Sequence, residues 1–178
     1  MFIKSLGVVL IVGVVLAGDL PSGPQVGQKL TPFKVLAFSG PDAGKELELL
    51  KKDKGPTLLI FVHKITRPAL KFLRPVDKFV AELEEGKLHA RIVWLSEDKD
   101  KAKEFLDRAK NSLNLETPIV ISLDGKDGPG AYGLNDQVAL TVLIAKGSKV
   151  EANFALIDPN ANDAPKVIRA LGKVTGKK

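Results

Sequence analysis

The stretch PTLLIFVHKITRPAL, residues 56–70, decides the fold, because it holds an apolar run, a polar bend and a proline-bearing helix start. The run at 56–62 has strand length and little polar content, the pattern of a strand buried on both faces of a sheet. From Thr66 onward, apolar residues recur at steps of three and four as far as Leu83, which predicts an amphipathic helix. Thr66 is a favourable N-cap for that helix, and Gly86 is a favourable stop.

The same alternation of strand and helix continues on both sides of this stretch. Short strands are expected at 33–38 and near 46–50, followed by strands at 90–96 and 118–123, with a charged helix at 98–113 between the last two. Residues 138–156 read as two strands joined by a Gly-Ser turn, which is a hairpin and not a crossover. Asp163 is the expected cap of a last helix over 164–174. This order predicts an α/β protein, with a central mixed β-sheet flanked by helices on both faces.

The composition sets limits on the function. The chain has 178 residues, enough for one domain with a sizeable core, and it contains no cysteine. Disulfides, zinc–thiolate sites, iron–sulfur clusters and thiol nucleophiles are therefore excluded. The formal net charge is +6, but Lys and Arg are scattered along the chain among Asp and Glu, so we expect an ordinary solvated surface. One Trp and one Tyr do not supply the aromatic residues of a nucleic-acid interface, so no nucleic-acid partner is expected.

The first residues have the pattern of a secretory signal peptide. One lysine precedes an apolar stretch over 6–17, and the small residues at its end predict cleavage near Ala17 or Gly18. The stretch is shorter than the roughly 20 residues of a membrane span, but an anchor retained over 6–17 is the alternative. We therefore expect an exported protein, periplasmic or secreted, with no membrane contact after signal removal. The expected organisation is a signal peptide (1–17), a flexible Pro/Gly-rich linker (18–25) and one folded domain (26–178).

Two long segments resemble a known family. Residues 26–62, VGQKLTPFKVLAFSGPDAGKELELLKKDKGPTLLIFV, are similar to the entry of the peroxiredoxin/redoxin branch of the thioredoxin-like superfamily. Residues 132–154, YGLNDQVALTVLIAKGSKVEANF, resemble its late segment, in which a Tyr-Gly turn precedes a strand and a Gly-turned hairpin. The resemblance implies a thioredoxin-like fold for nearly all of the expected domain, and a thiol oxidoreductase ancestry.

The resemblance also places a redox site at the bend, but the sulfur is missing. Thioredoxins carry Cys-x-Pro-Cys after the central strand, and the matching residues here are Thr66-Arg67-Pro68-Ala69. These keep the proline and replace both cysteines. In the peroxiredoxin register, Val62 stands at the family's proline and Ala69 at its peroxidatic cysteine. Neither register leaves a thiolate, so the resemblance implies the fold without its redox activity.

The second half of the family's site differs too. Family members place a cis-proline before the strand that corresponds to residues 141–144, opposite the cysteines. Ala139 occupies this position here. A cis bond before a residue other than proline costs roughly 3–4 kcal/mol, so a trans bond is expected. The loop that holds substrate in redox-active members should therefore have a different shape.

Two functions from different classes remain open. The first is a non-catalytic binding module whose former active-site face, Thr66–Ala69 with Ala139, contacts a protein or peptide. The second is a thiol-free enzyme or anion-binding site that uses His63, Thr66 and Arg67. A pocket in which the side chains of His63 and Thr66 converge would favour the enzyme, and a flat apolar face would favour the binding module. No cofactor is expected, and the partner and oligomeric state stay open.

Two other patterns are explained by structure alone. His63 falls at a strand end and His89 at a strand start, so these two histidines are not expected to share a metal site. Residues 96–99, Ser-Glu-Asp-Lys, formally fit the S-x-x-K pattern of some serine enzymes, but the accompanying motifs are missing. They are better explained as the cap of the following helix.

Overall fold

The computed structural model describes residues 20–51 and 55–177. The expected signal peptide with its cleavage site, and residues 52–54 and 178, lie outside this part of the chain. The described residues form one sheet of seven strands: β1 (Phe33–Ala37), β2 (Glu46–Leu49), β3 (Pro56–Val62), β4 (His89–Trp94), β5 (Ile119–Ser122), β6 (Leu140–Lys146) and β7 (Lys149–Leu156). The helices are α1 (Arg67–Ala81), α2 (Lys99–Leu113), α3 (Ala164–Thr175) and a short 3₁₀ turn, η1 (Gly130–Tyr132). Within these residues, no helix is both long enough and apolar enough to span a bilayer.

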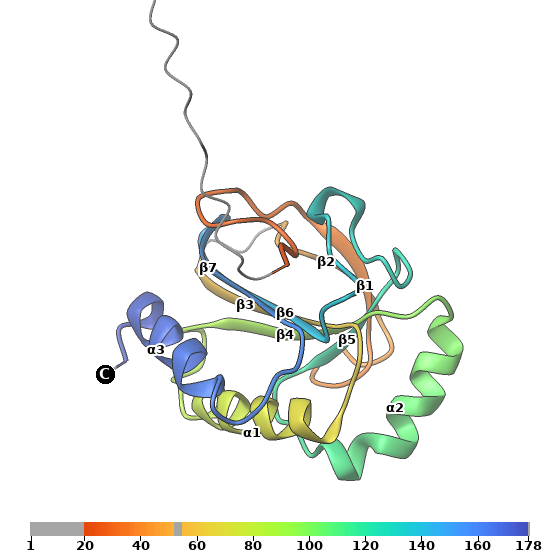
Figure 1. Cartoon of the computed structure of the whole chain (residues 1–178). Coiled ribbons are helices and arrows are strands. Elements are labelled where there is room, and N and C mark those ends of the chain that lie inside the picture. Colours follow the sequence, from red (N-terminus) through yellow and green to blue (C-terminus); the bar gives the residue numbers. More distant parts are fainter. Residues whose placement is uncertain (1–19, 52–54, 178) are drawn as a thin grey trace, which may run out of the picture.

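The sheet is mixed, as predicted. Its strands lie in the order β2-β1-β5-β4-β3-β6-β7 (Figure 1). β3 pairs in parallel with β4, and β4 with β5, whereas the other neighbours are antiparallel. β3 therefore lies inside the sheet between β4 and β6, which explains why its sequence is an unbroken apolar run.

The expectation of helices on both faces of the sheet is wrong for this chain. All three α-helices bury their apolar sides in one core cluster, on the face to which Leu58 and Ile60 of β3 point, and Figure 1 shows them together below the sheet. The reason lies in the strand order. The chain steps from β3 to β4 to β5 in one direction, so two right-handed crossovers must place α1 and α2 on the same side.

Chain segments and the short 3₁₀ turn η1, not α-helices, cover the opposite face. Its core cluster contains Phe33 of β1, Phe61 of β3 and Tyr132 of η1, whose ring centroids lie 5.4–5.8 Å apart. The hydroxyl of Tyr132 donates a hydrogen bond to the carbonyl oxygen of Thr31 at 2.8 Å. The three rings and this bond together hold the 3₁₀ turn and the residues just before β1 against the sheet.

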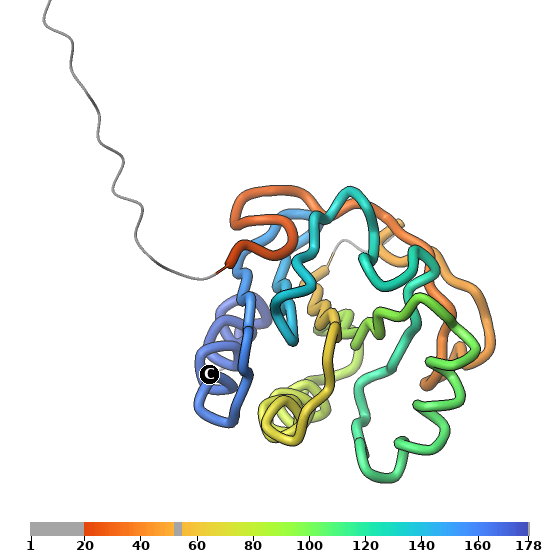
Figure 2. The backbone as a smooth tube through the Cα atoms, turned by 45° about the vertical axis from the view of Figure 1, so that its right-hand side comes forward, coloured from red at the N-terminus to blue at the C-terminus, as the bar shows by residue number. Residues whose placement is uncertain are grey.

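The described part of the expected linker, residues 20–25, is packed against the domain instead of flexible. Ser22 and Pro24 are buried, and the hydroxyl of Ser22 hydrogen-bonds that of Thr141. The side-chain amide of Asn153 on β7 donates to the carbonyl oxygens of Ser22 and Pro24, at 2.8 and 2.9 Å. Figure 2 shows this red segment folded back beside the blue strands. The prolines and the glycine of this segment prevent a regular ladder of main-chain hydrogen bonds, so side-chain donors bond its carbonyl oxygens instead.

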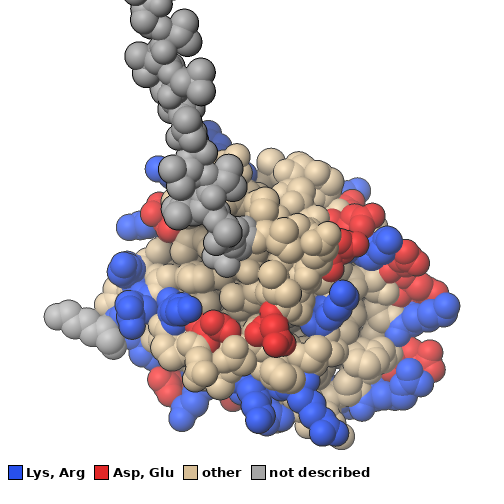
Figure 3. Space-filling view, in the orientation of Figure 1, with Lys and Arg blue, Asp and Glu red and all other residues tan. Residues whose placement is uncertain are grey.

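One smaller expectation also needs correction. Asp163 stands at the start of α3, but its carboxylate accepts the N–H of Asn160 at 3.1 Å and makes no bond to the helix N–H groups. Phe105 of α2 is 38% exposed and stacks on Trp94 with ring centroids 5.3 Å apart. In the space-filling view, blue Lys and Arg side chains are numerous along the lower edge and the left side, where α1 and α3 lie (Figure 3).

Candidate functional site

The bend between β3 and α1 is built around Thr66. β3 ends at Val62 and α1 begins at Arg67, so residues 63–66 make the connection. Thr66 has extended backbone angles, φ −126° and ψ 165°, and its Oγ1 accepts the N–H of Ala69 at 3.1 Å. This geometry is that of an N-cap and confirms the prediction from sequence.

The four residues that the resemblance matches to the redox motif, Thr66–Ala69, divide into an exposed part and a buried part. Thr66, Arg67 and Pro68 are exposed to solvent. The methyl group of Ala69 is fully buried, at 0% exposure, in the core cluster shared with the helices. The bend therefore presents a hydroxyl, a guanidinium group and a proline ring, while its fourth position belongs to the core.

Ala139 lies directly beside the bend. Its carbonyl oxygen accepts the backbone N–H groups of His63 at 3.0 Å and Lys64 at 3.2 Å, and its own N–H donates to Leu156 at 2.8 Å. The peptide bond that precedes Ala139 is trans, as are the other described peptide bonds. The loop before β6 is therefore tied to the bend through its main chain, at the position where the resemblance places the second half of the site.

His63 is the one histidine of the bend, and its ring is poorly solvated. The residue is partly buried, and its Nε2 atom is buried without a hydrogen-bond partner within the described part of the chain. Desolvation holds the pKa of His63 below its ordinary value of 6.5, while the carboxylates of Asp136 and Asp127 act in the opposite direction. Lys64 lowers the pKa further. The ring is accordingly held in its neutral form near neutral pH.

The structure does not join His63 and Thr66 into a nucleophile–base pair. Among the described residues no hydrogen bond links the two side chains, and the Thr66 hydroxyl is engaged with the N–H of Ala69. Arg67 points from the same bend and is exposed. The three residues of the alternative site are thus neighbours in sequence without a shared polar contact, and a general base must lie within hydrogen-bond reach of the proton it takes.

The histidines lie at opposite ends of two parallel strands. His89 pairs with Thr57 at the start of β3, whereas His63 follows the end of β3, about 20 Å away at the usual rise of a strand. Within residues 20–51 and 55–177, no cluster of three His, Asp or Glu side chains has metal-binding geometry.

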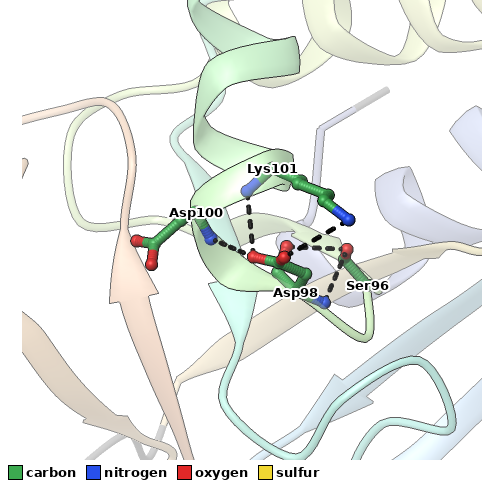
Figure 4. A network of polar contacts seen from close by, with 4 residues as sticks. All are labelled: Ser96, Asp98, Asp100 and Lys101. Carbon is green, nitrogen blue, oxygen red and sulfur yellow. Dashed lines mark hydrogen bonds and ion pairs between the residues drawn. The ribbon is translucent and has the colours of Figure 1, made fainter.

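The S-x-x-K segment forms the cap of α2, as expected. The carboxylate of Asp98 accepts the N–H groups of Asp100 at 2.9 Å and Lys101 at 3.1 Å, and Figure 4 shows both bonds. The Ser96 hydroxyl donates to the carbonyl oxygen of Asp98 at 2.9 Å. The bond from Lys101 is the largest reason why the pKa of Asp98 is lowered. These side chains are used for capping, so the segment has no catalytic arrangement.

One hollow in the surface was not indicated by the sequence. It measures about 510 Å³ and lies between the N-terminal segment, β7 and the start of α3, with Ser22, Asn153 and Lys166 among its lining residues. Its walls come from three distant parts of the chain. Only the packing of residues 20–25, which the sequence did not predict, brings them together.

Comparisons with solved structures place the fold. A protein from Bacteroides thetaiotaomicron, proposed to be a protein disulfide isomerase, superposes with a TM-score of 0.66 at 15% identity, over 89% of this chain and 96% of that chain. A peroxiredoxin-like protein from Aquifex aeolicus gives 0.59 at 15%, over 86% and 90%. The pneumococcal exposed lipoprotein thioredoxin from Streptococcus pneumoniae gives 0.58 at 16%, over 80% and 99%. The fold is therefore thioredoxin-like, as the resemblance implied, and the chain has no cysteine. No protein-family model matches the sequence, and no curated protein matches it either.

Proposed function

We propose that this chain is an exported thioredoxin-fold domain that binds a protein or peptide at the bend after β3 and carries out no thiol chemistry. One observation carries the proposal: the bend keeps an exposed surface, Thr66–Pro68, beside the Ala139 loop, in a chain without any sulfur nucleophile. Thiol–disulfide exchange and peroxide reduction both need a thiolate. What the bend can still do is make contacts.

The surroundings of the bend favour contact over catalysis. Ile157 is 56% exposed and directly follows Leu156, whose carbonyl oxygen is bonded to the N–H of Ala139. The Pro68 ring, in the bend itself, is also exposed. Apolar groups next to polar main chain are typical of surfaces that bind extended peptides. The separate positions of the His63 ring and the Thr66 hydroxyl make the enzyme alternative the weaker one.

Export is part of the proposal. It is supported by the signal-like pattern of residues 1–17, and by the resemblance of the fold to an exposed lipoprotein thioredoxin. The absence of cysteine is compatible with an oxidising compartment, because such a domain is held by its core alone.

Two measurements on the purified protein test the function. Insulin reduction and peroxide consumption should stay at the buffer blank, since no residue supplies a thiolate. Turnover that survives removal of thiol contaminants would refute the loss of chemistry.

Binding is tested with an envelope extract and two matched variants. Ile157→Asp places a charge beside the bend, and Val26→Asp places one at a residue that is 64% exposed on the N-terminal segment. The same captured protein should be lost with Ile157→Asp and kept with Val26→Asp. Equal capture by both variants would mean that the bend is not the binding surface.

A further inference from the structure

The outer ridge of α1 is formed by basic residues. Arg67, Lys71, Arg74 and Lys78 follow one another at steps of four, three and four, so they lie along one line of the helix, and all are exposed. They lie opposite the buried side of the helix. The one acidic residue of α1, Asp77, is buried at 8% exposure and lies off this ridge.

α3 repeats the arrangement next to α1. Lys166, Arg169 and Lys173 are exposed at steps of three and four, opposite the buried Val167 and Leu171. The two helices pack against each other on the same face of the sheet. Figure 3 shows blue side chains over both of them. We call the seven cations on these two ridges the basic face: Arg67, Lys71, Arg74, Lys78, Lys166, Arg169 and Lys173.

Glu82 and Glu116 line a depression together with Arg74 and Lys78, but the seven cations of the basic face form one ion pair within the described residues. Lys166 lies 3.7 Å from the carboxylate of Asp163, and Arg74 donates to the carbonyl oxygen of Ser112 at 3.1 Å. Apart from Lys166, the cations of the basic face form no ion pair within the described part of the chain. The outer side of α2 differs, because it mixes three acids with basic residues and forms a pair between Glu104 and Arg108 at 3.3 Å. The outer sides of α1 and α3 are therefore uniformly basic, whereas α2 carries charges of both signs.

The basic face also has an apolar hollow. A depression of about 500 Å³ lies between α1 and α3, with Phe79 and Ile168 among its lining residues. Three cations, Arg169, Lys173 and Lys177, contribute to the same depression. The Lys177 ammonium group lies 4.9 Å from the centre of the Phe79 ring and 3.2 Å from the Glu82 carboxylate. Cations beside apolar side chains match the interface of a lipid bilayer, where charged headgroups lie above acyl chains.

We propose that the basic face docks on the anionic surface of a lipid bilayer. Two packed helices lie 8–10 Å apart and each is about 10 Å wide, so the face is roughly 20 Å across. That is broader than the roughly 12 Å major groove of DNA, but it fits a flat bilayer. Trp94 and Tyr132 lie off these ridges, and the ring of Phe79 already carries the Lys177 ammonium group. The basic face therefore lacks the succession of aromatic side chains on which the bases of a single strand stack. This surface shares Arg67 with the proposed peptide contact and otherwise extends away from it along α1 and α3. The sequence alone predicted no membrane contact.

Charge-neutralising variants on vesicles test the proposal. The parent protein and all variants in this test begin at Asp19. They retain every described strand and helix and both core clusters. The docking variant carries Lys71→Gln, Lys78→Gln, Arg169→Gln and Lys173→Gln. A matched control carries Lys99→Gln, Lys103→Gln, Lys110→Gln and Lys146→Gln, which removes the same charge from exposed sites off the face. Thermal melts confirm that each variant is folded.

Co-sedimentation with vesicles of phosphatidylglycerol and phosphatidylcholine should show a selective loss. Each cation near an anionic bilayer contributes about five-fold to affinity, so the docking variant should bind about 100- to 1,000-fold more weakly than the parent chain. The control should lose about ten-fold at most. Binding should vanish in about 1 M salt, where the Debye length is ~3 Å. Equal losses in the two variants, salt-resistant binding to pure phosphatidylcholine, or tighter binding to duplex DNA than to vesicles at the same salt would each overturn the proposal.

Discussion

Rebuilding the missing redox pair measures how closely the bend matches the thioredoxin site. The double variant Thr66→Cys with Ala69→Cys creates Cys-Arg-Pro-Cys. The Oγ1 atom of Thr66 lies 3.1 Å from the amide nitrogen of Ala69, so a sulfur in its place would face the free N–H groups of the first helical turn. Those groups and the nearby Arg67 favour a thiolate, and the pKa of the new thiol should fall below the reference of about 8.5.

The energetic cost follows from the same geometry. Loss of the N-cap oxygen costs about 1 kcal/mol. A sulfur added at position 69, where the native methyl is fully buried, costs about 1–3 kcal/mol. The reduced variant should therefore be roughly 2–4 kcal/mol less stable than the parent chain. Closing a four-residue loop with a disulfide should return roughly 2 kcal/mol.

Urea unfolding of the oxidised and reduced protein measures this difference, and alkylation rates against pH give the thiol pKa. Insulin reduction should remain slow, because Ala139 does not supply the family's proline, and adding Ala139→Pro should raise it. A control pair, Thr66→Cys with Leu70→Cys, places the second sulfur one residue further round the helix and should close less readily. Failure of residues 66 and 69 to bridge, or equal bridging by the control pair, would refute the alignment of this bend with the redox site.

Three further outcomes are expected. The pKa of His63 lies below 6.5 in the folded protein, so the unfolded chain takes up a proton first as pH falls. The free energy of unfolding should therefore decline from about pH 7 until the folded pKa is passed. His63→Leu should flatten that decline when it is measured by urea unfolding. The carboxylate of Asp77 accepts the N–H groups of Glu116 at 3.0 Å and Thr117 at 2.7 Å, so Asp77→Ala should cost about 2–4 kcal/mol by leaving both unpaired. Asp77→Asn should cost less, and the exposed control Asp107→Ala should stay within about 0.5 kcal/mol. Mass spectrometry of the exported protein should find a chain that begins at Gly18 or Asp19, and an intact Met1 would indicate a retained anchor.

The sequence predicted the central unit well because its signals are local. The apolar run at 56–62 became β3 without a change of bounds, and Thr66 caps α1 as expected, since an N-cap needs only its own helix. The side on which α1 and α2 lie was missed. That side depends on the order of strands in the sheet, which is a non-local property.

The basic face was missed for a different reason. Read along the chain, the lysines and arginines look scattered, and only the helical period brings Arg67, Lys71, Arg74 and Lys78 into line. The spacing of four, three and four was present in the sequence and would have revealed the α1 ridge. The sequence could not predict that the α1 ridge lies next to the α3 ridge, because this depends on the tertiary packing of α1 against α3. The proximity of Ala139 to the bend came from the family resemblance alone.

The face of the sheet opposite the helices has a consequence for folding kinetics. It is closed by contacts between distant parts of the chain: Ser22 bonds Thr141 across a separation of 119 residues, and Tyr132 bonds Thr31 across 101. Contacts of such high contact order form slowly. During synthesis, the partner of Ser22 emerges only when β6 does, so this face must stay open while most of the chain is already made. For the export proposed above, this delay would help to keep the chain unfolded until it has crossed the membrane.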